Sequence, residues 1–273
     1  MNPDSAQHKP HVDWLTTLAI AAVAIALTQI IHEGTHALTC VAVGGDLKEF
    51  SALHVACESN SVAQSKIVSG SAAIVNLVIG FVLLAFLRRP QLGTASNQFF
   101  LWIFMLMNWL LGSGYLAFSG VANLGDWANV IDGGEPAWLW RVVMTVVGLG
   151  LYTYFVWLAL HEMGKLIGGN DAKEQISRAN KLGLLSYAAV FLVILGAAAT
   201  NPYGITGLPA IAALMLALGG MSPLAWMMQW FQAKSFEKLD KTPLEIEGEW
   251  SWVIVAALAV VLYSVILGRT LYF

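Results

Sequence analysis

Two histidines and a glutamate stand together near the end of the first long apolar stretch, in the sequence His32-Glu33-Gly34-Thr35-His36. In a helix, His32 and His36 lie one turn apart on the same face, so both imidazoles can bind one Zn²⁺ ion. Glu33 follows His32 directly, where its carboxylate can take a proton from water at that ion and return it later. Ionisable side chains inside a membrane span are costly, so three of them within five residues indicate a functional site.

A catalytic zinc site needs a third protein ligand and leaves a fourth position open. Two aspartates that follow the third apolar stretch are candidates, because that stretch ends on the same side of the membrane as the histidines. Asp126 lies in weakly polar surroundings that can sit at the depth of the histidines, and we prefer it as the ligand. Asp132 lies in a more hydrophilic segment and stays the alternative.

The composition places these residues in a membrane protein. Of 273 residues, 58% are hydrophobic and 11% are charged, whereas soluble domains have about 25% charged residues. The same scarcity of charge excludes intrinsic disorder, and the net charge of −3 gives no reason to expect a nucleic-acid partner.

A helix needs about 20 apolar residues to cross the hydrocarbon core. The pattern therefore predicts an all-α polytopic membrane protein with about seven (six to seven) transmembrane helices. We expect them at Trp14–Val43, Ile67–Leu87, Gln98–Ser119, Trp138–Leu160, Leu182–Ala199, Leu208–Phe231 and Trp252–Leu267.

The remaining segments are short. We expect residues 1–13 to be a polar tail, residues 14–135 to form the core with the zinc site, and residues 136–273 to add helices to the same membrane domain. Asp171–Lys181 and Lys234–Glu249 are expected to be solvated connectors, with a short interfacial helix as the alternative for the first.

Several other polar residues have simpler interpretations. Cys40 and Cys57 are expected to be free thiols, because two cysteines do not make a disulfide framework, and a single disulfide pair is the alternative. His54 is expected on the surface, and His161-Glu162 lacks a second imidazole at metal-binding spacing. Asn76 lies within a predicted span, where it can form an interhelical hydrogen bond or orient the site.

The histidine motif in a membrane span, followed two spans later by an Asn- and Asp-containing stretch, resembles the site-2 protease family of intramembrane zinc metalloproteases. The resemblance covers roughly residues 14–135. The family's third zinc ligand is an Asp in a Leu-Asp-Gly element after an Asn-containing stretch. Asn123-Leu124-Gly125-Asp126 offers the Asn and the Asp without the family's prolines, and Ile131-Asp132-Gly133-Gly134 matches the literal element better.

Two further segments are similar to the family. Ser69–Asn76 resembles its Gly-x-x-x-Asn stretch, which implies that Asn76 takes part in substrate binding. Gly44–Lys66 resembles its short connector, which can be rich in β-structure.

The positive-inside rule and the family resemblance give opposite orientations. Ten Lys and Arg residues fall on the side of the N-terminus and four fall on the side where the first span ends, which places the N-terminus in the cytoplasm. The resemblance instead implies a zinc ion near the cytosolic side, so the sequence leaves the orientation open.

Together, the motif and its setting predict an intramembrane zinc endopeptidase with one catalytic Zn²⁺, which hydrolyses a peptide bond within or beside a transmembrane helix. Its expected partners are a transmembrane-helix protein or peptide substrate, the lipid bilayer and an adaptor protein that the sequence does not identify. We expect a multi-pass protein of the cell (cytoplasmic) membrane. The alternative is a non-proteolytic zinc-binding membrane protein, such as a transporter, a sensor or an inactive helix-binding scaffold.

Overall fold

The computed structural model of the chain describes residues 11–89, 93–169, 171–230 and 242–273. Within these ranges, seven helical segments are long and apolar enough to cross a membrane. This confirms the prediction of an all-α polytopic membrane protein. The segments are α1 (Trp14–Ala42), α2 (Val62–Leu87), α3 (Ala95–Ala122), α5 (Ala137–Ile167), α6 (Ala172–Thr200) and the composite runs Leu208–Trp230 and Trp250–Arg269.

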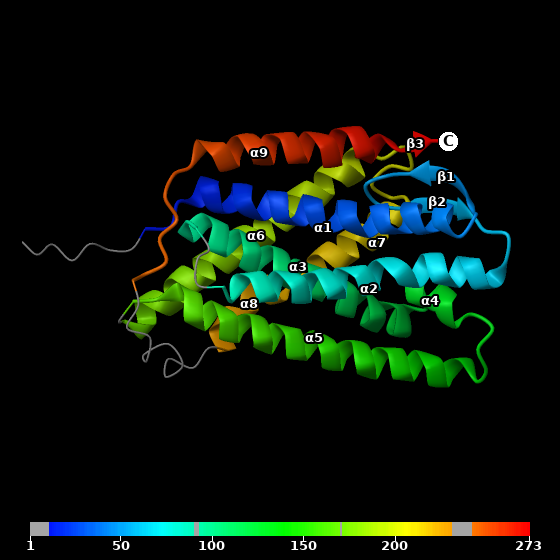
Figure 1. Ribbon diagram of the computed structural model, residues 1–273, viewed down its shortest axis with the longest axis horizontal. Coiled ribbons are helices and arrows are strands. Elements are labelled where there is room, and N and C mark those ends of the chain that lie inside the picture. The colour runs from blue at the N-terminus through cyan, green and yellow to red at the C-terminus, as the bar shows by residue number, and fades with distance from the viewer. Residues whose placement is uncertain (1–10, 90–92, 170, 231–241) are drawn as a thin grey trace, which may run out of the picture.

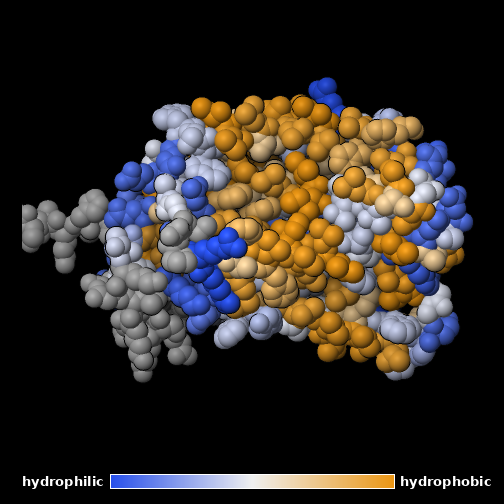
Figure 2. All heavy atoms as spheres, in the orientation of Figure 1, coloured by the Kyte–Doolittle hydropathy of each residue, from blue (hydrophilic) through white to orange (hydrophobic). Residues whose placement is uncertain are grey.

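On the face that Figure 2 shows, apolar side chains form a band across the middle of the molecule, with hydrophilic residues at both ends. The long helices run roughly along the direction that joins the two hydrophilic ends (Figure 1). Large apolar side chains such as Phe81, Val146 and Leu258 are exposed, and a bilayer would cover them. The chain is therefore a multi-pass integral membrane protein.

The two composite spans change helix type along their length. The first consists of α7 (Leu208–Met215), a π-helical turn, α8 (Pro223–Trp226) and a 3₁₀ turn. The second consists of α9 (Trp250–Val260) followed by π-helical and 3₁₀ turns. Pro223 has no backbone N–H to donate, so it stands at the start of α8 and not inside a longer helix.

The central helix is α1, which carries both histidines of the motif. Asp13 caps its N-terminus, because Oδ1 accepts a hydrogen bond from the Thr16 backbone N–H at 2.7 Å. Residues 19–26 are buried, and their many alanines let α2, α3, α6 and α9 pack against α1. The helix thus passes through the interior of the bundle and carries its last turns to the far end.

The connector Gly44–Lys66 contains a β-hairpin, as the resemblance implied. β1 (Asp46–Phe50) pairs antiparallel with β2 (Val55–Glu58). β3 (Leu271–Tyr272), at the C-terminus of the chain, pairs with the other edge of β1 and gives the strand order β2-β1-β3. The sequence did not predict this third strand, because two residues show no strand periodicity.

The expectation of two free thiols is wrong, because Cys40 and Cys57 form a disulfide. Cys40 lies near the end of α1 and Cys57 lies on β2, so the bond fastens the hairpin to the helix. Gly45 packs directly against the bond: a Cβ atom there would lie 2.9 Å from the Cys57 Sγ and 3.1 Å from the Cys40 Sγ. The backbone of the connector is thus shaped around the disulfide.

The expectation of a solvated connector at Asp171–Lys181 is also wrong, and the helical alternative is nearer, because Ala172–Lys181 forms the first turns of α6. Arg178 in this segment is buried and donates hydrogen bonds to the backbone carbonyls of Ile167 and Leu244. These hydrogen bonds join the end of α5 to the extended segment that contains Leu244, so the guanidinium group of Arg178 does not lie on a solvated face.

The predicted connector Lys234–Glu249 lies partly outside the described residues, which resume at 242. The described part buries Leu244 and Ile246, and the Ile246 N–H donates to the His11 carbonyl at 3.0 Å. This part of the connector packs against the bundle and is not solvated along its whole length.

The β-sheet, α4 (Asp126–Ile131), the last turns of α1 and the C-terminus gather at one end of the molecule, which we call the hairpin end (Figure 1). The start of α1, the end of α2 and the start of α3 lie at the opposite end (Figure 1). The histidine motif lines one pocket together with residues of the hairpin and of α4.

Candidate metal centre

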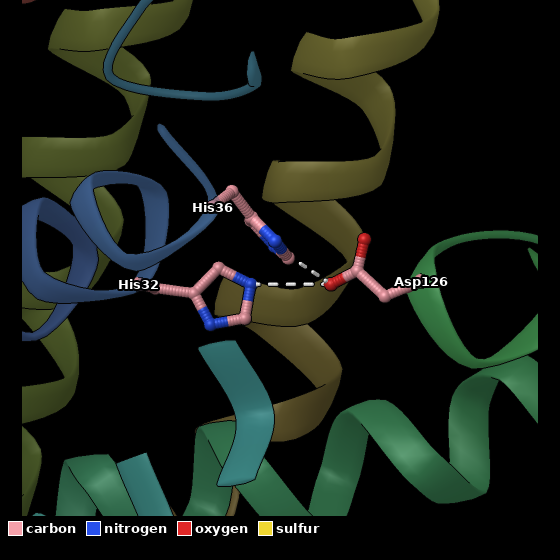
Figure 3. A group of neighbouring side chains, drawn as sticks. All are labelled: His32, His36 and Asp126. Carbon is pink, nitrogen blue, oxygen red and sulfur yellow. Dashed lines mark hydrogen bonds and ion pairs between the residues drawn. The ribbon is translucent and has the colours of Figure 1, made fainter. Parts of the chain in front are cut away.

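Three side chains converge at the hairpin end of the bundle (Figure 3). His32 and His36 project from adjacent turns of α1, and Asp126 approaches from the first turn of α4. The Nε2 atoms of His32 and His36 lie 3.4 Å and 3.1 Å from the Asp126 Oδ2. Among the described residues, this is the one group of three or more His, Cys, Asp or Glu side chains whose ligand atoms come close enough to share a metal ion.

The Nδ1 atom of each imidazole forms a hydrogen bond with an oxygen atom of α2. The His32 Nδ1 lies 2.8 Å from the Asn76 Oδ1, and the His36 Nδ1 lies 2.8 Å from the Val68 carbonyl oxygen. A carbonyl oxygen can only accept, so each Nδ1 carries the proton and donates it. The Nε2 atoms are then the free ligand atoms, and both face Asp126.

The Asn76 amide is itself fixed from behind. Its Nδ2 donates to the Asn108 Oδ1 at 2.8 Å, and the Asn108 Nδ2 donates to the Phe104 carbonyl oxygen at 2.8 Å. These two bonds decide which end of the Asn76 amide faces His32. Both asparagines are fully buried, so the chain of hydrogen bonds runs through the bundle interior and orients one ligand of the site.

The corner between α3 and α4 brings Asp126 to the histidines. Asn123 ends α3 in the left-handed conformation with φ of 55°, and Gly125 precedes α4 with φ of 82°. Glycine adopts such a φ without strain. A Cβ atom at Gly125 would also lie 2.8 Å from the Tyr115 ring, so this position requires glycine for two reasons.

Hydrogen bonds fasten α4 to its neighbours. The Asn129 Nδ2 donates to the Ser65 Oγ at 3.0 Å and to the Ser69 Oγ at 2.7 Å, which joins α4 to α2. The Arg141 side chain donates to the Gly120 and Val121 carbonyls at the end of α3. Side chains of α2 therefore hold the short helix that carries Asp126, and Arg141 holds the end of α3 that precedes it.

The three converging residues line a pocket of about 270 Å³ at the hairpin end. Glu33 lines the same pocket and is 9% exposed, and Tyr115 forms part of its wall. Ser65, Ser69 and Asn129 continue the lining, and Asn129 is exposed, so the pocket connects the buried motif with the surface. Water can therefore reach a site that begins inside a membrane span.

The donor set suits Zn²⁺. A tetrahedral zinc ion with ligands at about 2.0–2.1 Å has ligand atoms about 3.3 Å apart, which is close to the two His–Asp distances of 3.4 Å and 3.1 Å. Asp126 would be the anionic ligand, because a carboxyl group with an ordinary pKa of about 3.9 is ionised at neutral pH, and its Oδ2 faces the Nε2 atoms of both imidazoles.

The structure distinguishes the two aspartates that the sequence offers as the third metal ligand. Asp126 meets the histidines, whereas Asp132 ends α4, is exposed, and its backbone carbonyl accepts a hydrogen bond from Lys66. Asn76 touches His32 and Asn108, and it does not line the pocket. Its position favours the orienting role over direct contact with a substrate.

His54 reaches the pocket, although the sequence placed it on the surface. Its Nε2 lies 2.8 Å from the Glu49 Oε2 and its Nδ1 lies 2.8 Å from the Ser51 Oγ, so both ring nitrogens already have partners. The Tyr203 hydroxyl also donates to Glu49 at 3.1 Å. These contacts hold the hairpin as a wall of the pocket and leave no ring N–H of His54 free for a bound molecule.

His161 and Glu162 have structural partners far from the pocket. His161 stacks on Trp157, and the Glu162 carboxylate accepts hydrogen bonds from Arg88 and Lys165. Both side chains thus have partners within the fold.

Sequence reasoning missed the Val68 carbonyl and Tyr115 as parts of the site. A backbone carbonyl gives no sequence signal, and an aromatic residue in an apolar helix looks like any other packed side chain. Asn108 is a polar residue in an apolar stretch, but its contact with Asn76 depends on how α2 and α3 pack.

Comparisons of the chain with protein-family models, with curated proteins and with solved structures find no match. The resemblance to site-2 proteases therefore stays a prediction that rests on the motifs.

Proposed function

We propose that this protein is an intramembrane zinc endopeptidase of the cell (cytoplasmic) membrane, which hydrolyses a peptide bond within or beside a transmembrane helix. One observation carries the proposal: His32, His36 and Asp126 converge in a pocket that Glu33 also lines, at the end of a membrane helix. Two imidazoles, one carboxylate ligand and a separate carboxylate base are the parts that zinc-dependent hydrolysis requires.

Each residue of the site has a distinct task. His32, His36 and Asp126 would hold Zn²⁺, which supplies a water of lowered pKa and polarises the scissile carbonyl. Glu33 takes the proton from the attacking water and then gives it to the leaving nitrogen. Asn76 keeps the His32 Nε2 aimed at the site by accepting a hydrogen bond from the Nδ1–H.

The walls of the pocket favour an extended peptide as the substrate. β2 is an edge strand of the sheet, and its residues Val55 and Cys57 line the pocket. An extended segment can pair with the free edge of a strand, whereas a helical carbonyl is already hydrogen-bonded within its helix. The substrate is therefore a membrane helix that unwinds locally, for example at Gly, Pro or Asn.

The test is a cleavage assay with the purified full chain. The substrates are tagged single-span membrane proteins with Gly, Pro or Asn near one end of the span, and the chelator 1,10-phenanthroline is the control. We expect one zinc per chain and cleavage that stops with the chelator and returns with added zinc. Bound zinc without cleavage of any substrate would reject the protease and leave a metal-binding membrane protein.

A further inference from the structure

The Cys40–Cys57 disulfide bears on the side of the membrane that the metal centre faces. Disulfides persist in oxidising compartments and are rare in the cytosol. This one joins the last turns of α1 to β2, and Gly45 fits closely against both sulfur atoms. The hairpin end is thus built around a bond that is stable on the non-cytoplasmic side.

The distribution of positive charge is a second, independent observation. Short cytoplasmic loops carry an excess of Lys and Arg. Assigned by the loop or the helix end that carries them, four of these residues belong to the hairpin end: Lys48, Lys66, Arg141 and Arg269. Six described residues belong to the opposite end: Arg88, Arg89, Lys165, Lys173, Arg178 and Lys181. By chain order alone, the sequence adds four to this side, because Lys9 precedes α1 and Lys234, Lys238 and Lys241 precede α9.

We infer that the metal centre opens on the non-cytoplasmic side of the membrane. The substrate is then a membrane protein whose susceptible bond lies within or next to the non-cytoplasmic end of a transmembrane helix; this second statement rests on the proposed function. The orientation is opposite to the one that the resemblance to site-2 proteases implies.

The disulfide and the metal centre share one compartment because they share one helix face. His32, His36 and Cys40 follow one another at intervals of four residues on α1, so the sulfur lies one turn, about 6 Å, beyond the second histidine. Cys57 lines the same pocket as the histidines. The solvent that enters the pocket is therefore the solvent in which the disulfide formed.

Cysteine labelling in sealed cells that express the full chain tests this orientation without any assay of activity. Thr206→Cys places a thiol on the exposed loop before α7, beside Tyr203, which contacts the hairpin. Ser177→Cys places a matched, exposed thiol on the first turns of α6 at the opposite end. With Cys40 and Cys57 joined, each variant has one free thiol in the whole chain.

A membrane-impermeant maleimide is expected to label Thr206→Cys before lysis and Ser177→Cys only after lysis. The reverse pattern would overturn the inference. In the wild-type chain, denatured without reductant, we expect no labelling, and two labels after reduction. Labelling of both native cysteines without reductant would show that the disulfide is absent, and the disulfide would then no longer support a non-cytoplasmic metal centre.

The two proposals can fail separately. If labelling gives the expected pattern but the purified chain cleaves nothing, the orientation stands and the protease assignment falls. If the chain cleaves but labelling is reversed, the protease stands and the non-cytoplasmic access falls. In the case that both hold, mass spectrometry of the fragments should place the cut near the non-cytoplasmic end of the substrate helix.

Discussion

The two histidines are held by partners of different kinds. The His36 Nδ1 donates to a backbone carbonyl, which no side-chain substitution at Val68 removes, whereas the His32 Nδ1 depends on the Asn76 side chain. The His32 ligand can therefore be loosened by mutation without touching the ligands themselves.

Asn76→Leu should lower zinc affinity by about 10- to 100-fold, because the outer partner of a metal-binding imidazole fixes its tautomer and direction. The measurement is competition for zinc with a chromophoric chelator, together with the thermal unfolding of the metal-free protein. Asn97→Leu, an exposed amide near the start of α3, is the matched control and should leave zinc affinity unchanged. Equal zinc affinity in Asn76→Leu and the wild type would show that the bond to His32 does not orient the site.

Glu33→Gln should keep zinc and lose cleavage by at least about 10²- to 10⁴-fold, because glutamine has a similar shape but cannot take a proton from water. Zinc content and turnover are measured on the same purified preparation. Turnover close to that of the wild type would exclude Glu33 as the general base. Loss of zinc would instead make it part of the metal site.

Asp126→Asn should lower the zinc content of the purified protein, because it replaces an anionic ligand that faces both imidazoles. Asp132→Asn is the control at the other end of α4, and its zinc content should equal that of the wild type. The opposite result, with zinc lost only from Asp132→Asn, would show that the second aspartate is the ligand.

At this scale, much of the site could be read from the sequence. His32, Glu33 and His36 stand out because they are ionisable residues in an apolar stretch, and Asp126 was preferred because its surroundings suit the depth of the histidines. The contacts that orient them could not be read, because the Val68 carbonyl and the Asn76 amide become partners only when α2 packs beside α1.

The elements bring the ligands together through one tight corner. The α3–α4 corner needs a positive φ at Gly125 and no Cβ atom against Tyr115. Gly133, at the other end of α4, also has a positive φ of 73° but has open space around it.

Gly125→Ala should therefore displace Asp126 and weaken zinc binding, whereas Gly133→Ala should cost stability but spare the site. Alanine is strained at both positions because both have a positive φ, but only at Gly125 would its Cβ atom meet Tyr115. A difference in zinc affinity between the two variants therefore measures the effect of the contact with Tyr115. The measurement is zinc affinity beside thermal unfolding for each variant. Similar zinc affinity in both would mean that the corner adapts without moving Asp126.

The helices could be predicted from the sequence and several of their contacts could not. Apolar stretches located the spans, because a bilayer requires long apolar helices. The β3 strand was not predicted, and the Cys40–Cys57 disulfide and the helical start of α6 were only the alternatives, because each depends on a partner distant in sequence. Arg178 illustrates the reason: its charge suggested solvent, but backbone carbonyls in the fold bind it.

At the scale of the whole molecule, the composition predicts a membrane protein, and the fold determines where the pocket with the candidate metal ligands lies. Charged residues are 11% of the chain, and the structure gathers the hydrophilic ones at two ends (Figure 2). The pocket lies at the end where α1 carries its histidines to the sheet. Neither the depth of the pocket nor its connection to the surface follows from composition.

Zinc K-edge X-ray absorption on the purified full chain tests the central claim most directly. We predict one zinc per chain with two imidazole nitrogens and carboxylate or water oxygens at about 2.0–2.2 Å, and no sulfur at about 2.3 Å. The imidazole signal should disappear in the double variant His32→Ala, His36→Ala. Sulfur ligands, or an imidazole signal that survives in the double variant, would contradict a metal centre made by His32, His36 and Asp126.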